Sequence, residues 1–125
     1  MSGVEALFAP VGGWVVKIID LSAPAEDNLL EEVKGFPSLM QANEFARRYV
    51  RDSLEHCRTP GLSAAEIVAT WMEFGEDAVV ADAGEGGFSS APEVGNWAKF
   101  KAGAEERDWR SLDPRRIGDV ESELP

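Results

Sequence analysis

Carboxylates are the most numerous reactive groups in the middle of this chain. Three lie within the stretch MEFGEDAVV, at Glu73, Glu76 and Asp77, and two follow it, at Asp82 and Glu85. Converging carboxylate oxygens bind calcium, and a facing pair of carboxylates hydrolyses glycosidic bonds. The spacing does not match an EF-hand, which needs acids at alternating positions and a closing glutamate. We therefore interpret these acids first as a solvated loop. The alternative is a small metal-dependent or carboxylate-based hydrolase using Glu76, Asp77 and Asp82.

His56 and Cys57 form the other reactive pair, and the chain holds one residue of each type. Neighbours on a helix point about 100° apart, so this imidazole is badly placed to activate the adjacent thiol. One histidine and one cysteine do not make a zinc site within a single chain. The glycine-rich stretch GEGGF lacks the Lys-Ser/Thr pair that follows in a P-loop. The sequence thus predicts no catalytic residue, no cofactor and no metal ion.

Three arginines, Arg47, Arg48 and Arg51, form a basic ridge on a predicted helix. In one reading they pair with acids of the same helix, at Glu44, Asp52 and Glu55. In the other reading the ridge docks on an acidic surface, possibly residues 73–85 of a second copy.

Two helices must position these groups. The first is predicted over 38–57 from a capping box at Ser38 and Gln41. Its apolar stripe has helical spacing and consists of Ala42, Phe45, Ala46, Tyr49, Val50, Leu54 and Cys57. The second is predicted over 63–74 from a capping box at Ser63 and Glu66. Its buried stripe is predicted to be Ile67, Val68, Trp71 and Met72. Gly75 is predicted to close this helix with a positive φ.

The remaining pattern predicts an α+β fold, in which a two- or three-stranded antiparallel sheet packs against two to three helices. A run rich in β-branched residues predicts a strand over 14–21. A second strand is expected over 29–36, with Leu30 and Phe36 on one face. A short strand or a buried extended segment is expected from Val79. A third helix is expected near 91–102, opened by a capping box at Ser90, with Val94, Trp97 and Ala98 inward.

The C-terminal stretch is charged and aperiodic, so we expect one α+β domain over 1–103 and a tail over 104–125. The tail has few apolar residues, and these include Trp109, Leu112 and Ile117. Too few are present for independent folding, yet tryptophan is well suited to anchoring interfaces. The tail is therefore expected to be mobile in the monomer and to order by placing Trp109 on a partner. The alternative is that the tail packs back on its own domain.

The formal net charge is −11, and no Lys or Arg occurs between Arg58 and Lys99. This acidity disfavours direct binding to nucleic acid or to anionic membranes, and favours a basic protein partner. No apolar run reaches the roughly 20 residues of a membrane span, and the N-terminus lacks the basic region of a signal peptide. The single cysteine excludes an internal disulfide. A cytoplasmic bacterial protein is the expectation.

One likeness to a known family rests on two motifs. Pro60, Gly61, Ser63, Ala64 and Glu66 match a Pro-Gly-x-Ser/Thr-Ala-x-Glu segment, and the Phe-Gly-Glu-Asp motif follows at residues 74–77. The chain thereby resembles a family of small, uncharacterised bacterial proteins over roughly residues 14–103. It departs at Ala78, where the family has proline. The resemblance implies no activity, cofactor or catalytic residue.

These observations predict a non-enzymatic interaction or accessory protein that self-associates or is bound to a larger protein assembly. A helix end requires Gly75 but does not require the two acids after it. The residues expected to carry the interaction are Glu76, Asp77, Arg47, Arg48, Arg51 and Trp109.

Overall fold

The structure is a computed structural model that describes residues 10–116. Three antiparallel strands form one sheet in the order β2-β1-β3. The strands are β1 (Trp14–Asp20), β2 (Leu29–Phe36) and β3 (Glu76–Val80), and the helices are α2 (Leu39–His56), α3 (Ala64–Phe74) and α4 (Val94–Trp97). Short 3-10 turns occur at η1 (Ala25–Asp27), η2 (Gly84–Gly86), η3 (Glu105–Arg107) and η4 (Arg110–Leu112). The predicted α+β fold is confirmed.

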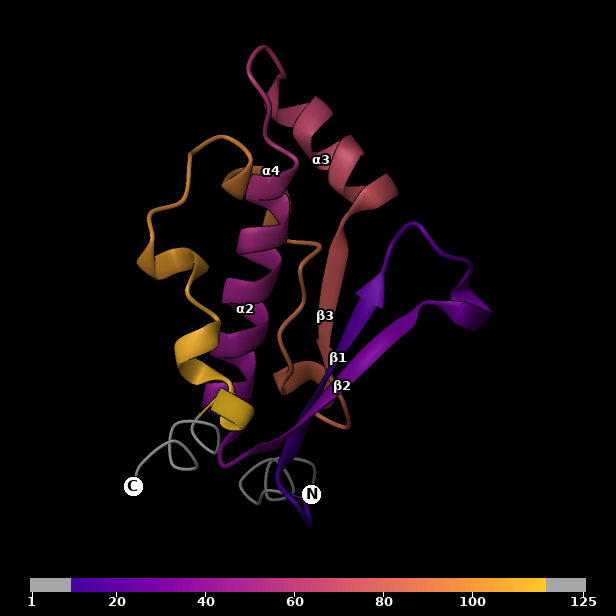
Figure 1. The fold of residues 1–125 in the computed structure, drawn as a ribbon, viewed down its shortest axis with the longest axis vertical. Coiled ribbons are helices and arrows are strands. Elements are labelled where there is room, and N and C mark those ends of the chain that lie inside the picture. The colour runs from indigo at the N-terminus through magenta and orange to yellow at the C-terminus, as the bar shows by residue number, and fades with distance from the viewer. Residues whose placement is uncertain (1–9, 117–125) are drawn as a thin grey trace.

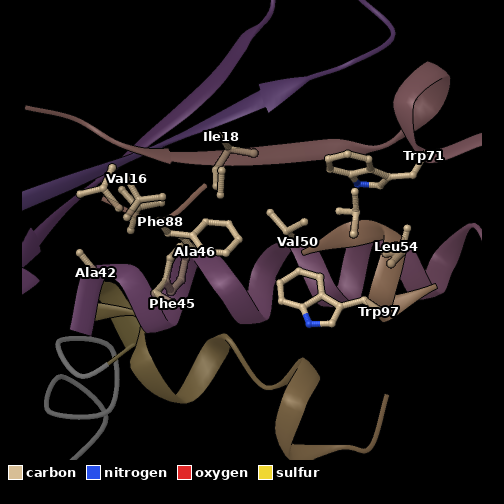
Figure 2. Packing of buried hydrophobic residues seen from close by; sticks show 14 of the residues in the cluster. Val16, Ile18, Ala42, Phe45, Ala46, Val50, Leu54, Trp71, Phe88 and Trp97 are labelled. Atoms are coloured by element: carbon tan, nitrogen blue, oxygen red, sulfur yellow. The ribbon is translucent and has the colours of Figure 1, made fainter. Parts of the chain in front are cut away.

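The central strand β1 carries the inner face of the sheet. Trp14, Val16 and Ile18 are buried, because alternate residues of a strand point to the same side. The helix α2 packs on this side (Figure 1). Figure 2 shows Val16 and Ile18 pointing from the sheet toward α2, with Ala46 and Val50 beneath them. The predicted stripe of α2 forms this core, although Tyr49 and Cys57 are only partly buried.

The edge strand β2 contains a bulge that the period-two pattern does not reveal. Ile18 pairs with Glu31 and Ile19 pairs with Leu29, so Leu30 is an extra residue in the ladder. Leu30 is 51% exposed. A second irregularity lies nearer the end of the strand, where Trp14 pairs with Phe36 and Val16 pairs with Val33, so Val33 lies beside Phe36 in the core. The prediction that Leu30 faces inward was wrong.

The second helix has the predicted start and end, but one residue of its predicted buried stripe is exposed. The Ser63–Glu66 capping box is complete, with both reciprocal bonds formed. Ile67 and Trp71 are buried as predicted, whereas Met72 is 63% exposed. Met72 lies on the outer side of α3 because that helix meets the rest of the fold through one narrow stripe.

Gly75 closes α3 as expected but does so without a positive φ. Its backbone is extended, at φ −84° and ψ −170°, and its N–H donates to the Trp71 carbonyl. A Cβ at this position would lie 2.2 Å from Trp71 Cδ1. The prediction of a left-handed Gly75 was therefore wrong, and glycine is required here by the close approach of the Trp71 indole.

The third helix is shorter than expected. α4 spans four residues, and Ser90 does not cap it: Ser90 is buried, and the residue before the helix is Glu93. The inward positions Val94, Trp97 and Ala98 are buried, as predicted. Before α4 the chain runs back between α2 and β3 (Figure 1), held by the Asn43 side chain, which bonds Gly86 and Phe88 backbone atoms.

Residues 104–116, hereafter the C-terminal segment, lie on α2 on the side away from the sheet (Figure 1). Trp109 packs edge-on against Phe45 with the ring centroids 5.9 Å apart. The structure thus differs from the expected mobile tail over these residues, because α2 offers ion-pair partners as well as aromatic rings. Ile117 and the rest of the predicted tail lie outside the described residues. Within residues 10–116, no helix has the length and apolar character needed to cross a bilayer.

Candidate functional site

The basic ridge of α2 is engaged within the chain. Arg47 and Arg48 both pair with Glu44, at N–O distances of 2.7 and 2.9 Å. Arg48 also donates to the Asp108 carbonyl, and the Arg47 guanidinium lies 5.5 Å from the Phe88 ring centroid. Local pairing therefore occupies these two side chains, in agreement with the first of the two readings.

Arg51 is buried rather than presented on a solvated face. It is 8% exposed, donates to the Phe100 carbonyl and lies over the Trp97 ring at 5.3 Å. Its ion-pair partner is Glu106 of the C-terminal segment. Sequence alone could not indicate this burial, because it depends on the chain that covers α2 from outside.

The two acids after Gly75 begin strand β3, three residues earlier than predicted, and both are partly buried. Glu76 faces α2 and accepts a hydrogen bond from the Tyr49 hydroxyl at 2.5 Å. Burial, and secondarily this bond, raise the pKa of Tyr49, so the phenol remains the donor. Asp77 is the next residue of the strand and points to the opposite side. The two carboxylates therefore point away from each other and do not form the facing pair that hydrolysis requires.

Asp77 is partly buried without a cationic partner among residues 10–116. Burial raises the pKa of Asp77, while hydrogen bonds from the Ala78 N–H and Ser90 act in the opposite direction. Asp82 follows the far end of β3 and is exposed. These acids were predicted to be exposed, and the prediction was wrong for Glu76 and Asp77 because both belong to the sheet.

Trp109 lies close to Glu76 in the fold, although the two residues are far apart in the sequence. The Trp109 ring centroid is 5.0 Å from that of Tyr49, and its indole N–H donates to the Asp52 carboxylate. Asp52 also accepts from Arg107 Nε at 2.7 Å. A hollow of about 140 Å³ opens between these groups and is lined by Tyr49, Asp52, Ser53, His56, Glu76, Trp109 and Arg110.

A larger hollow of about 520 Å³ adjoins this small one, since the two share Ser53, His56 and Glu76. Its remaining lining comes from the end of α2, the connection to α3 and the end of α3, and includes Cys57, Leu62, Thr70, Phe74 and Gly75. We call the two hollows together the α2–β3 groove. Of the six residues predicted to carry an interaction, the groove contains Glu76 and Trp109 and lacks the others.

The polar groups of the groove are arranged around the backbone of β3. The Glu76 N–H donates to the Ser53 hydroxyl at 2.9 Å, which fixes the start of the strand against α2. Burial raises the pKa of the Cys57 thiol, so this thiol is a weaker nucleophile than a free one at neutral pH. His56 is exposed at the rim. No hydrogen bond joins His56 to Ser53, Cys57 or Glu76 within the described residues.

Metal ligands do not converge at this groove. Residues 10–116 contain no group of three or more His, Cys, Asp or Glu side chains placed to hold a metal ion. The carboxylates nearest the groove, Glu76 and Asp52, are engaged with Tyr49, Arg107 and Trp109. The absence of a cofactor stays a prediction.

Sequence reasoning missed Tyr49 and Ser53 as groove residues. Tyr49 was assigned to the core stripe of α2, and its polar end is what reaches Glu76. A buried tyrosine hydroxyl usually has a hydrogen-bond partner, which is the signal that this position offered. Ser53 gave no signal, because an isolated serine in a helix is usually exposed to solvent.

No family model, curated protein or solved structure matches this chain. The likeness to the Phe-Gly-Glu-Asp family stays a prediction. The residues of the groove and their chemistry are therefore the basis for a functional assignment.

Proposed function

We propose that this chain is a non-enzymatic accessory protein that binds a protein partner through the α2–β3 groove. The partner is either a second copy or a component of a larger assembly. The observation that carries the proposal is the composition of the large hollow. It joins a partly buried carboxylate to an exposed aromatic side chain, that of Phe74 at 69% exposure, on one concave surface.

Concave surfaces with an aromatic residue and a few polar groups are typical of binding sites rather than of solvated surface. A tryptophan and a tyrosine lie at the other end of the groove, and these residue types are enriched at binding hot spots. The acidic charge of the chain adds long-range attraction for a basic partner. The hydrolase alternative has less support, because β3 directs Glu76 and Asp77 to opposite sides.

Replacing Phe74 by aspartate tests this proposal. The side chain is exposed, so Phe74→Asp should change the free energy of unfolding by no more than about 0.5 kcal/mol. A charge in the groove should nevertheless lower the recovery of a stoichiometric partner from native cells by about tenfold or more. Recovery is measured by affinity capture with the full chain.

Phe100→Asp is the matched control. Phe100 is 64% exposed and does not line the groove. Partner recovery should be unchanged in this variant. Equal recovery with Phe74→Asp and with the unsubstituted chain would remove the groove from the interface.

A further inference from the structure

Glu76 has a carboxylate that no cation of the described chain neutralises. Its hydrogen-bond donor is the neutral Tyr49 hydroxyl, and it forms no ion pair with any residue in 10–116. Three other carboxylates with little exposure are each paired with an arginine: Asp52 with Arg107, Glu55 with Arg58 and Asp113 with Arg115. Asp77 also lacks a cation among residues 10–116, but it does not line either hollow. Since removing a carboxylate from water is unfavourable unless a cation is near, Glu76 is an incomplete ion pair.

The large hollow gives access to this carboxylate. Among residues 10–116, no lysine or arginine lines it, and Glu76 is the one carboxylate of the lining. Its volume of about 520 Å³ is well above the ~150 Å³ that accommodates a benzene molecule. The hollow therefore has room for a long side chain and for part of the backbone that bears it.

We propose that a lysine or arginine side chain of the partner protein enters the large hollow and pairs with Glu76. This inference rests on the proposed function, and it specifies the chemistry of the partner. Leu62 lies in the lining where the aliphatic part of such a side chain would pack. The exposed ring of Phe74 is a further favourable contact for a cation.

The small hollow shows that this part of the molecule already holds a cation next to an aromatic face. The Arg110 guanidinium lies 4.3 Å from the Trp109 ring centroid, and Arg110 lines the small hollow beside Glu76. Arg110 opposes the entry of a second positive charge through Coulomb repulsion. Removal of Arg110 should therefore strengthen binding of the partner's side chain, whereas removal of the Glu76 charge should weaken it.

The experiment titrates the isotope-labelled full chain with short peptides and follows the backbone amides of Phe74, Gly75 and Glu76 by NMR. One alanine-based peptide carries a single central arginine, and the second carries citrulline, which has nearly the same shape without the charge. A free guanidinium compound, agmatine, is the third probe. We expect the arginine peptide to shift these amides with about tenfold higher affinity than the citrulline peptide or agmatine.

Three variants locate the effect. Glu76→Gln keeps an acceptor for the Tyr49 hydroxyl and should lower the affinity for the arginine peptide by about tenfold. Glu85→Gln removes the same charge from an exposed position in η2 and should have little effect. Arg110→Ala should raise the affinity.

Equal shifts with the arginine and citrulline peptides would overturn the inference, and so would equal affinities in Glu76→Gln and Glu85→Gln. Agmatine binding as tightly as the peptide would contradict the assignment to a partner's side chain. None of these results depends on capture of the cellular partner. A failed ion pair and a failed groove interface are thus distinguished by the Phe74→Asp measurement.

Discussion

An alanine at position 75 would place its Cβ 2.2 Å from Trp71 Cδ1 and 2.7 Å from the Trp71 carbonyl oxygen. Neither atom belongs to a flexible chain end, since Trp71 lies on the buried side of α3. The indole N–H also donates to the Glu76 carbonyl, which ties the ring to the start of β3. Gly75 therefore positions Glu76 through packing, and this explains why the strand starts immediately after the helix.

We expect Gly75→Ala to lower the free energy of unfolding by about 1–3 kcal/mol, the usual cost of overpacking a well-filled site. Chemical denaturation measures this change. Gly95→Ala is the control, because a Cβ at Gly95 meets nothing within 4 Å. It should be neutral or slightly stabilising, as alanine is the better helix former. Equal effects of the two substitutions would contradict the contact with Trp71.

At the residue scale, the sequence identified Gly75 and Glu76 as important positions. It did not indicate why glycine is required at 75 or which residue Glu76 contacts. A Phe-Gly sequence after a helix is typical of a left-handed cap, and nothing in the local pattern indicates that an indole approaches the glycine. Sequence reasoning could not pair Glu76 with Tyr49, because these residues come from different elements. Residue-scale errors here arise from contacts between elements.

At the scale of elements, the C-terminal segment is attached to α2 through both ion pairs and aromatic contacts. Arg107 pairs with Asp52, Glu106 pairs with Arg51, and Trp109 contacts Phe45 and Tyr49. This segment forms one wall of the small hollow through Trp109 and Arg110. Loss of its attachment would therefore change the groove as well as the stability of α2.

We expect Trp109→Ala to lower the free energy of unfolding by about 2 kcal/mol, less than for a fully buried tryptophan because the ring is partly exposed. Trp109→Phe retains an aromatic contact with Tyr49 and loses the hydrogen bond to Asp52. It should cost about 1 kcal/mol. Denaturation of the full chain measures both, and an unchanged stability in Trp109→Ala would show that the segment does not rest on α2.

The elements with strong periodicity were predicted closely, and those without it were not. Apolar residues at spacings of three and four, with a cap at Ser38, define α2 to within one residue of each end. The Gln41 half of that capping box does not form, because its amide donates to the Leu112 carbonyl instead. The C-terminal segment gave no periodic signal, since it is built from short turns that contact α2 and, through Arg115, Glu31 of β2.

At the scale of the whole molecule, stability in acid depends on carboxylates paired with arginine. Asp113 is 5% exposed, and its two oxygens accept from Arg115 Nε and Nη2 at 3.0 and 2.7 Å. Burial alone would raise the pKa of Asp113, but the hydrogen bonds and charge of Arg115 outweigh burial. The pKa of Asp113 therefore lies below its ordinary value of 3.8.

A depressed folded-state pKa stabilises the fold above pH 3.8, and this contribution is lost as the pH falls through the folded value. We expect Asp113→Asn to lower the free energy of unfolding at pH 7 by about 1 kcal/mol, since Arg115 is partly exposed. The difference from the unsubstituted chain should shrink toward pH 2. Denaturation curves across this pH range test the expectation, and a constant difference would contradict it.

The charge pattern predicted an acidic molecule with a local basic ridge. In the structure, several of the basic side chains form contacts within the chain. Arg48, Arg51 and Arg107 hold the C-terminal segment on α2. Glu76, which lines both hollows of the groove, forms no ion pair with any residue in 10–116. Composition could indicate a basic partner, and the arrangement of α2, α3 and β3 is the basis on which we propose Glu76 as the carboxylate that meets it.

Site-specific photo-crosslinking tests the central claim, that the α2–β3 groove binds a protein partner, most directly. A benzophenone amino acid replaces Phe74 in one full-length chain and Phe100 in another, and both are irradiated in native cells. Both positions are exposed, but Phe74 alone of the two lines the groove. The proposed function predicts one discrete adduct, to a second copy or to another protein, from position 74 and none of comparable yield from position 100. Equal yields from both positions, or no adduct from position 74, would contradict it.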